Sequence, residues 1–324
     1  MILIVGENLA WQKVCRVASL RRGEVNRVSE MRVFASSKGP NVARALGTLG
    51  GVGEVIGYAG GATGMLVRDY LRVEGMHCDL VDIQAETRTC VTYVEPDGSC
   101  TELIEPSPGV TPIERDRCAA TFAKRISEAR VLVISGTAVA GEDAECYVRF
   151  IRAAHDKGIP VLLDSSSREA RLALAQSPEV LKINAHELGE ITGLPVENAP
   201  QRLAACRQLM GRHGIRWCLV SRGSAGIEAT NGRAVLRGVP PQIAVVNAIG
   251  SGDAAAAGTS WVMHEHLDGL RDSALFDNEQ VFTEAVLVAT AMGTANCLST
   301  VTGHVDPDAF RNVKGQTRIL PLES

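Results

Sequence analysis

Signatures of a membrane or nucleic-acid-binding protein are missing from this chain. It has no apolar run long enough to span a bilayer. It also has no strongly basic stretch, and its formal net charge is −4 with a pI of about 6.0. The chain starts with a strand-like apolar segment at residues 2–5, without the basic region and long apolar stretch of a signal peptide. These absences favour a cytoplasmic protein with neither a membrane nor a nucleic-acid partner.

The cysteines follow no metal-binding or disulfide pattern. There are nine of them, scattered along the chain, and none forms a Cys-x-x-Cys pair. An odd, unpatterned count argues for reduced thiols instead of disulfides or zinc ligands. We therefore expect most of them to be small core residues.

The repeating pattern along the chain is a short apolar strand followed by a helix. Apolar runs at residues 131–134, 161–163 and 218–220 each end in Ser, Gly or Asp, and helical patterns at 142–155 and 201–213 lie between them. Such alternation predicts an α/β fold with a mostly parallel central sheet covered by helices on both faces. We expect one domain over residues 1–324, with ligands bound at the C-terminal ends of the strands.

One region breaks the alternation. Residues 87–95 and 100–105 alternate in residue type around Pro96-Asp97-Gly98, which indicates an antiparallel hairpin. With part of residues 10–35 it would form a small β-sheet. Beside a ligand crevice, such a sheet would act as a lid that excludes water, although an edge extension of the main sheet or an oligomer contact is also open.

The most informative segment is a glycine-rich turn near the C-terminus. The apolar run 243–246 reads as a buried strand, Gly250-Ser251-Gly252-Asp253 as the turn, and the four alanines that follow as a helix. The free N–H groups at a helix start favour an anion, and glycines let a phosphate approach them. Asp253 beside this pocket could take a proton from an attacking hydroxyl, as phosphoryl transfer to an alcohol requires. The alternative is a structural turn, since the motif is neither a P-loop nor a dinucleotide fingerprint.

Other polar residues have a structural and a chemical interpretation. Asn41, before a predicted helix at 42–49, would cap that helix or point its amide at a sugar hydroxyl. Asn184 and Glu187, three residues apart after an apolar strand at 180–183, would form a capping box or order water around Mg²⁺. Arg88 on the predicted hairpin would clamp a substrate phosphate or lie exposed.

Taken in order along the chain, four motifs resemble the ribokinase/PfkB family of carbohydrate kinases, and most closely its 1-phosphofructokinase and tagatose-6-phosphate kinase branch. The motifs are Lys38-Gly-x-Asn41, Asn184-x-x-Glu187, Ser221-x-Gly223 and Gly250-x-Gly252-Asp253. The match runs from residue 2 to about residue 307. It implies a ribokinase-like fold with a small β lid, and an ATP- and Mg²⁺-dependent kinase of a sugar phosphate. In relatives the lid hairpins often form a dimer contact, so a homodimer through the lid is a further expectation.

The resemblance also implies roles for single residues. Asp253 would be the general base, and the backbone of Gly250, Ser251 and Gly252 would form the anion hole. Mg²⁺ and its waters would be organised by Asn184 and Glu187. The remaining matched positions would bind ATP (Lys182, Asn184, Ser221, Gly223, Gly226 and Asn296) or the sugar substrate (Gln12, Lys38, Gly39, Asn41, Arg88 and Ser135).

The chain departs from the family pattern mainly on the substrate side. Gln12 replaces a sugar-binding carboxylate, and an amide accepts a hydrogen bond less strongly but can also donate one. Two alternatives therefore stay open besides the sugar-phosphate kinase. One is a kinase of an unphosphorylated sugar or nucleoside, and the other is a non-catalytic sensor of a sugar phosphate or nucleotide.

Overall fold

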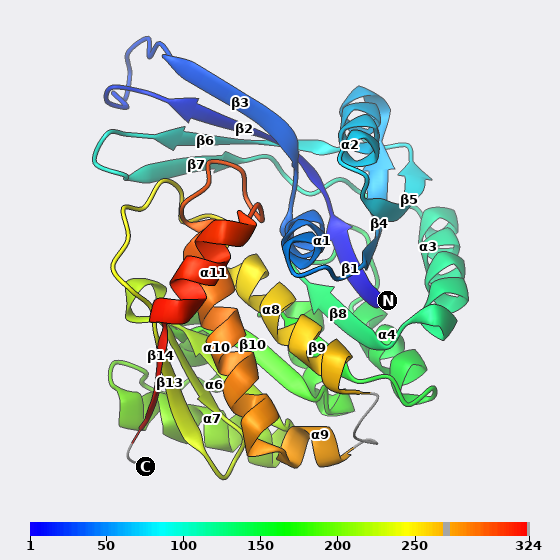
Figure 1. Cartoon of the computed structure of the whole chain (residues 1–324). Coiled ribbons are helices and arrows are strands. Elements are labelled where there is room, and N and C mark those ends of the chain that lie inside the picture. Colours follow the sequence, from blue (N-terminus) through cyan, green and yellow to red (C-terminus); the bar gives the residue numbers. More distant parts are fainter. Residues whose placement is uncertain (268–272, 323–324) are drawn as a thin grey trace.

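The computed structural model describes residues 1–267 and 273–322. A ten-stranded sheet runs through the molecule in the order β14-β13-β12-β11-β10-β9-β8-β1-β4-β5 (Figure 1). The strands from β11 to β5 are parallel, whereas β12, β13 and β14 are antiparallel additions at one edge. The strands of this sheet are β1 (Ile2–Asn8), β4 (Gly53–Gly60), β5 (His77–Ile83), β8 (Val131–Ser135), β9 (Val161–Asp164), β10 (Val180–Asn184), β11 (Trp217–Ser221), β12 (Ile227–Thr230), β13 (Val235–Val239) and β14 (Arg318–Pro321).

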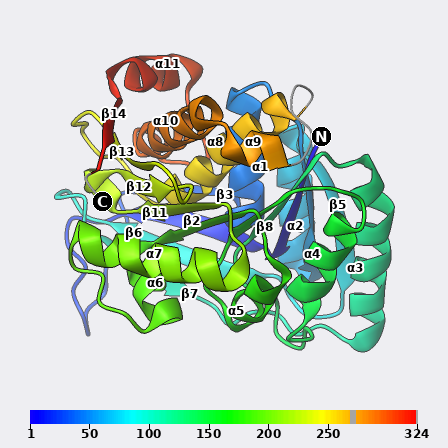
Figure 2. The same ribbon diagram turned by 90° about the horizontal axis from the view of Figure 1, so that it is seen from below.

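Helices cover both faces of this sheet, as the view from below makes plain (Figure 2). One face carries α1 (Lys38–Thr48), α8 (Ser251–His266), α9 (Ser273–Asp277), α10 (Glu279–Asn296) and α11 (Pro307–Gln316). The other carries α3 (Pro112–Arg125), α4 (Cys146–His155), α5 (Arg168–Ala173), α6 (Ala185–Thr192) and α7 (Ala199–His213). Short 3₁₀ turns occur at Ile126–Glu128, Leu174–Gln176 and Gly223–Ala225.

Alternation along β1 explains the two layers. Ile2 and Ile4 join the apolar cluster under α1, α8 and α10, whereas Leu3 and Val5 join the cluster under α3, α4 and α7. Successive side chains of a strand point to opposite faces, so a fully apolar strand must be covered on both sides. The predicted α/β class, with helices on both faces, is confirmed.

A second sheet of four strands stands apart from the first, at the top of Figure 1. It is formed by β2 (Ala10–Arg16), β3 (Glu30–Ser36), β6 (Arg88–Val94) and β7 (Cys100–Ile104), in the order β3-β2-β6-β7. The strands β6 and β7 pair antiparallel, as the predicted hairpin requires, and β2 joins β6 in parallel. The helix α2 (Gly61–Val73) packs against this small sheet through Val67 and Leu71.

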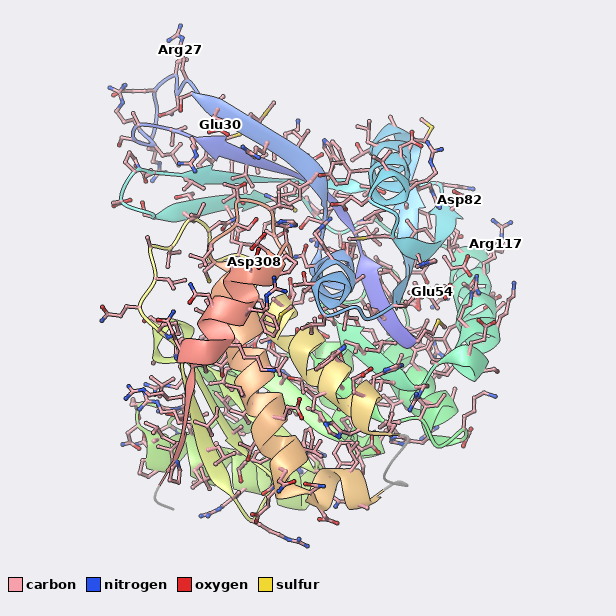
Figure 3. The ribbon with its side chains drawn as sticks, viewed as in Figure 1. Arg27, Glu30, Glu54, Asp82, Arg117 and Asp308 are labelled. Carbon is pink, nitrogen blue, oxygen red and sulfur yellow. The ribbon has the colours of Figure 1, made fainter. Side chains whose placement is uncertain are left out.

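Charged side chains lie mainly on the periphery. Figure 3 shows Arg27 at the tip of the small sheet, with Asp82, Arg117 and Asp308 projecting outward elsewhere; all four are exposed. Among the described residues, no helix is long and apolar enough to cross a membrane.

Three sequence-based boundaries were wrong. The helix α1 begins at Lys38, not after Asn41, because Pro40 is tolerated in a first turn where its missing N–H is not needed. The helix α4 begins at Cys146 instead of residue 142, since the Asp143 carboxylate accepts a hydrogen bond from the Glu145 N–H and forms a local turn.

The third wrong prediction concerns the apolar run 243–246, which was expected to be a strand but is not one. Two prolines at 240–241 lack N–H donors for a sheet ladder. The N–H groups of Val246 and Asn247 donate instead to the carbonyl of Cys297, at 2.8 and 3.2 Å. The run therefore forms an extended loop, and Val245 is 53% exposed.

Candidate active site

The C-terminal ends of adjacent parallel strands bring distant polar residues together. Ser135 at the end of β8 is paired in register with Asp164 at the end of β9, and Asn184 on β10 is paired with Ser221 on β11. The Ser135 hydroxyl donates to Asp164 Oδ2 at 3.1 Å. The strand register therefore places these polar residues side by side at the C-terminal edge of the sheet, where ligands were predicted to bind.

The glycine turn lies at the start of a helix, as its sequence indicated. Gly250 is the N-cap of α8 and has a φ of +82°, in the left-handed region that favours glycine. A Cβ there would lie only 2.9 Å from the Gly303 nitrogen. The first N–H groups of α8 have no intrahelical acceptor and carry the positive end of the helix dipole, so the turn suits an anion.

Asp253 stands in the first turn of α8 and is buried. Its Oδ2 accepts a hydrogen bond of 2.7 Å from the Asn41 side-chain amide. Burial raises the pKa of Asp253 above its usual range; Lys38 opposes this increase, and the nearby Asp164 adds to it. The arrangement is a buried carboxylate that holds a proton more readily than an ordinary aspartate does.

Asn41 does not cap a helix, so that interpretation was wrong. It lies inside α1, and its Oδ1 accepts hydrogen bonds from Ser36 Oγ (3.2 Å), Thr302 Oγ1 (2.9 Å) and the Arg44 guanidinium (3.2 Å). Three donors on the carbonyl oxygen fix which end of the amide faces Asp253. These supporting residues were missed from the sequence, because none belongs to a motif and the contact to Thr302 spans 261 positions.

Two lysines share one buried carboxylate beside this turn. Asp164 Oδ1 is 3.0 Å from Lys182 Nζ and 3.5 Å from Lys38 Nζ, and Asp164 is only 1% exposed. Burial would raise the pKa of Asp164, but Lys182 and Lys38 together hold it below its usual range. Burial works against the ammonium of Lys38, yet Asp164 and then Asp253 raise the pKa of Lys38 above its usual value.

The Lys182 ammonium also borders the glycine turn. A Cβ built on Gly252 would lie 3.0 Å from Lys182 Nζ. A cation and the open N–H groups of α8 therefore face the same space. Asp164 was not among the predicted site residues, although its place at the end of a continuous apolar strand was the signal that could have found it.

Of the predicted sugar-side residues, Gln12 and Arg88 lie on strands of the small sheet, and Gly39 lies in the first turn of α1. Gln12 is buried and donates from Nε2 to Thr92 Oγ1 at 2.8 Å. Arg88 donates to the Asn8 carbonyl at 3.1 Å, while its Nε is buried without a hydrogen-bond partner. Burial lowers the pKa of Arg88. Gly39 packs directly against Gly6, where a Cβ would lie 2.8 Å from the Gly6 Cα, so Gly39 allows α1 to approach β1.

A cavity of about 400 Å³ opens on the other side of the glycine turn. Ser221, Gly223 and Gly226 line it together with Gly252 and residues of α10. Gly226 has a φ of +86°, and a side chain there would overlap the Gly238 carbonyl. The volume falls within the usual range of small-molecule sites, about 300–1,000 Å³.

Two predicted binding residues have their side chains engaged within the protein. Asn296 is buried and does not line the cavity; its amide donates to the Ile249 carbonyl (2.9 Å), and its Oδ1 accepts from the Gly303 N–H (2.7 Å). Asn184 forms a capping box with Glu187, at 2.9 and 2.7 Å. The structural interpretation of this pair is therefore realised. Mg²⁺ keeps several of its waters, so the same pair still fits an outer-sphere role at the exposed end of β10.

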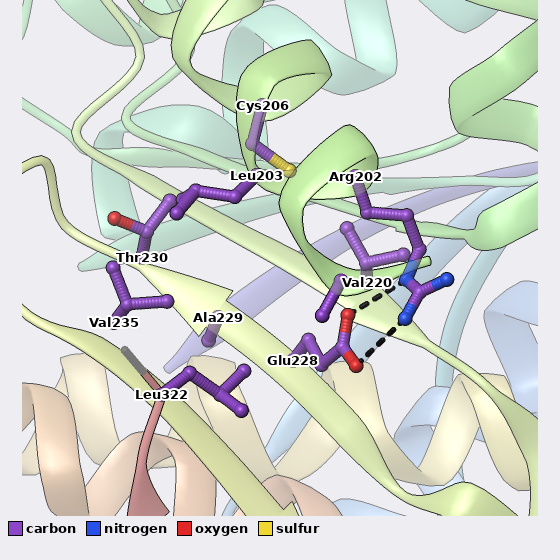
Figure 4. A pocket seen from close by; sticks show the side chains of 10 residues that line it. Arg202, Leu203, Cys206, Val220, Glu228, Ala229, Thr230, Val235 and Leu322 are labelled. Atoms are coloured by element: carbon purple, nitrogen blue, oxygen red, sulfur yellow. Dashed lines mark hydrogen bonds and ion pairs between the residues drawn. The ribbon is translucent and has the colours of Figure 1, made fainter. Parts of the chain in front are cut away.

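A much smaller cavity, of about 20 Å³, lies away from these strand ends, between α7 and the β12–β13 edge (Figure 4). Arg202 and Glu228 form a buried ion pair there at 2.7 Å, and Arg222 adds a second contact to the same carboxylate. The space is about that of one water molecule, so this pair belongs to the packing and not to a ligand site.

Comparisons with known proteins identify relatives of this chain and proteins of similar fold. The chain is 30% identical over 301 residues to a tagatose-6-phosphate kinase of Staphylococcus epidermidis, covering 92% of both chains. Phosphofructokinase-2 of Escherichia coli, solved with potassium, has a similar fold (TM-score 0.84, 23% identity, 97% and 98% coverage). So does a ribokinase of Arabidopsis thaliana, solved with ribose and ATP (TM-score 0.74, 19% identity, 97% and 98% coverage).

The family model described as the pfkB family of carbohydrate kinases matches residues 2–308, which include every predicted site residue. A match over nearly the whole chain shows the family. The chain belongs to the pfkB family of carbohydrate kinases, is an enzyme of that family, and resembles its sugar-phosphate kinases.

Proposed function

We propose that this enzyme transfers the γ-phosphoryl group of ATP to a hydroxyl of a hexose phosphate, of the tagatose 6-phosphate or fructose phosphate kind. The observation that carries the proposal is the buried Asp253 carboxylate at the start of α8, bonded to Asn41 and facing the same region as Lys38 and Lys182. A base, an anion cradle and two cations are the parts that phosphoryl transfer to an alcohol needs.

The proposed step balances as follows. The substrate hydroxyl oxygen forms a bond to the γ-phosphorus, the bond to the β-phosphate oxygen breaks, and ADP leaves. Asp253 takes the hydroxyl proton, and since Oδ2 holds the Asn41 amide, Oδ1 is the oxygen that we assign to this transfer. The N–H groups of the glycine turn, with the Lys182 ammonium, stabilise the negative charge that spreads over the γ-phosphoryl oxygens.

ATP would occupy the 400 Å³ cavity, with its phosphates toward Gly252. Asn184 and Glu187 would hold waters of a Mg²⁺ ion, which would supply positive charge to neutralise the phosphates. Lys38 and Arg88 would bind the phosphate already on the sugar, and Gln12, Asn41 and Ser135 would face its hydroxyls. Arg88 fits a clamp because its Nε is a buried donor without a protein acceptor.

The test is ADP formation with MgATP against tagatose 6-phosphate, fructose 6-phosphate, fructose 1-phosphate and the free hexoses. We expect turnover on one sugar phosphate, and a loss of about 10²–10⁴-fold in kcat in Asp253→Asn, because a positioned base contributes roughly that factor. The variant should keep its melting temperature and its affinity for ATP. Turnover within tenfold of the wild type would rule out Asp253 as the base.

Two other functions remain as outcomes of the same assay. Replacement of the family carboxylate by Gln12 changes the sugar-facing surface, and this favours testing unphosphorylated sugars and nucleosides too. For these, Arg88→Ala should leave KM unchanged, whereas a phosphorylated substrate should lose affinity. ATP binding without turnover on any substrate would support a sensor instead of a kinase.

We also propose a homodimer through the small sheet. Its surface exposes Met31 (55%), Leu103 (59%) and Ile104 (58%) on the two edge strands β3 and β7, and exposed apolar side chains on unpaired strand edges are costly in water. Light scattering after size-exclusion chromatography should give twice the chain mass of 34.4 kDa. A Leu103→Lys variant should then elute as a monomer, and a monomeric wild type would end the proposal.

A further inference from the structure

A buried acidic cluster lies on β1 outside the residues assigned to phosphoryl transfer. The carboxylates of Glu7 and Glu142 and the thiol of Cys146 place one donor atom each within 4.8 Å of one another. Glu7 belongs to β1 and is 1% exposed, while Cys146 is the first residue of α4 and is completely buried. Glu142 lies in the segment between β8 and α4. The surrounding layer is the apolar cluster under α3 and α4.

These acidic groups lack the partners that burial normally requires. Both oxygens of Glu7 and the Oε2 of Glu142 are buried without a hydrogen-bond partner. The backbone amide of Val139 favours the charged form of Glu7 but makes no hydrogen bond of ordinary geometry with it. A buried carboxylate without a partner costs several kcal/mol, so native proteins pair it, protonate it or coordinate it to a metal.

Protonation alone is a poor solution here. A neutral acid would still need an acceptor for its proton and a donor for its other oxygen, and among the described residues neither oxygen of Glu7 has a hydrogen-bond partner.

The donor set suits one divalent cation of intermediate softness. Zn²⁺ accepts both carboxylate oxygens and thiolate sulfur, whereas Mg²⁺ and Ca²⁺ prefer oxygen alone. Bond lengths of about 2.0–2.3 Å separate the ligand atoms of a tetrahedral zinc ion by roughly 3.3–3.8 Å. Small side-chain movements would therefore close the cluster around an ion.

We propose that Glu7, Glu142 and Cys146 form a structural Zn²⁺ site that ties β1 to the segment between β8 and α4. The cysteine spacing predicted no zinc site because a spacing pattern detects only ligands that are close together in the sequence. The ligands here are 135 residues apart between Glu7 and Glu142, and only the parallel pairing of β1 with β8 brings them together.

The site would brace the substrate side of the active site. Asn8 follows Glu7 directly; its carbonyl accepts from Arg88 at 3.1 Å, and its amide donates to Thr137 Oγ1 at 3.3 Å. An ion that holds Glu7 against the segment containing Thr137 would limit movement of the residues that position Arg88. The inference does not depend on the identity of the substrate, since the ion would be structural.

The experiment measures metal content by mass spectrometry, on untagged full-length protein reconstituted with Zn²⁺ and then dialysed. We expect about one zinc per chain in the wild type and less than about 0.2 in Glu7→Gln and in Cys146→Ser. The matched controls are Glu145→Gln, an exposed carboxylate three residues from Glu142, and Cys100→Ser, an exposed thiol; both should keep the metal. The Co²⁺-substituted wild type should show a thiolate-to-cobalt absorption band that Cys146→Ser lacks.

Thermal melting gives a second readout that needs no activity. A chelator should lower the Tm of the wild type and leave that of Glu7→Gln unchanged, so the proposal stays testable even if Cys146→Ser fails to fold. Wild-type protein with no bound transition metal after reconstitution would overturn the proposal and leave a protonated Glu7. Zinc retained by Glu7→Gln would overturn it as well, because the ion would then lie elsewhere.

Discussion

The buried carboxylate between two lysines gives the sharpest prediction about the site. Asn in place of Asp164 keeps the size of the side chain but removes the charge that holds Lys182 at 3.0 Å and Lys38 at 3.5 Å. A unit-charge pair at 3.0 Å attracts by about 5 kcal/mol at an effective dielectric constant of ~20, before desolvation is subtracted. Removing one partner of a buried pair typically costs about 3–5 kcal/mol, because an uncompensated charge is left behind.

That cost is large compared with the free energy of unfolding of a folded domain, roughly 5–15 kcal/mol. We therefore expect the Tm of Asp164→Asn to fall by on the order of 5–15 °C. The pKa of Asp164 is held below its usual range, so its contribution is fully present above about pH 4, the ordinary aspartate value, and is lost as pH falls through the lower folded value. The Tm difference between wild type and Asp164→Asn should therefore be constant at neutral pH and narrow in acid.

The kinetic effect separates positioning from stability. Below its Tm, Asp164→Asn should lose about 10²–10³-fold in kcat/KM for the sugar phosphate, since both ammonium groups lose their common anchor and small misplacements are costly. Glu228→Gln is the matched control: Glu228 is also a buried carboxylate between two cations, Arg202 and Arg222. It should lose comparable stability while the KM for the sugar phosphate stays unchanged.

Two results would refute this reasoning. A folded Asp164→Asn enzyme with kcat and both KM values within threefold of the wild type would mean that the carboxylate positions neither lysine. An equal loss of sugar-phosphate kcat/KM in Glu228→Gln would mean that the effect is a general consequence of destabilisation. A coupled ADP assay and a thermal melt on the three proteins decide between these outcomes.

Two further predictions concern the base and the glycine turn. Asn41 donates to Asp253 and lowers its pKa against the effect of burial, so Asn41→Ala should raise that pKa further. Because the base works deprotonated, the acid limb of the pH–kcat profile should then move to higher pH. An acid limb that stays at the same pH would contradict the assignment of Asp253 as the base. Gly250→Ala forces a side chain into a left-handed conformation and against the Gly303 nitrogen. This should lower the free energy of unfolding in denaturant by about 1–3 kcal/mol and reduce ATP turnover. A fully stable, active variant would show that the turn can adapt.

Much of the architecture followed from local pattern. Strands such as β8 and β9 are apolar up to their last residue, and only a sheet covered on both faces can bury them. The hairpin of β6 and β7 was evident from its alternation around Pro96-Asp97-Gly98. The prediction of a strand at 243–246 was wrong because apolar character alone does not specify a hydrogen-bonding partner, and the two prolines before the run lack N–H donors.

The chain alone determined which residue types were available to the site, because glycines that admit a phosphate, a carboxylate after them and the ordered motifs are properties of local sequence. Which groups meet was decided only by the tertiary structure. Asn41 contacts Asp253 across 212 residues, and Lys38 shares Asp164 with Lys182. The pKa of Asp164 lies below the ordinary aspartate value because two cations pair with it, whereas the pKa of Asp253 lies above that value mainly because of desolvation. Burial and charge proximity are set by packing over long sequence distances, and no local pattern encodes them.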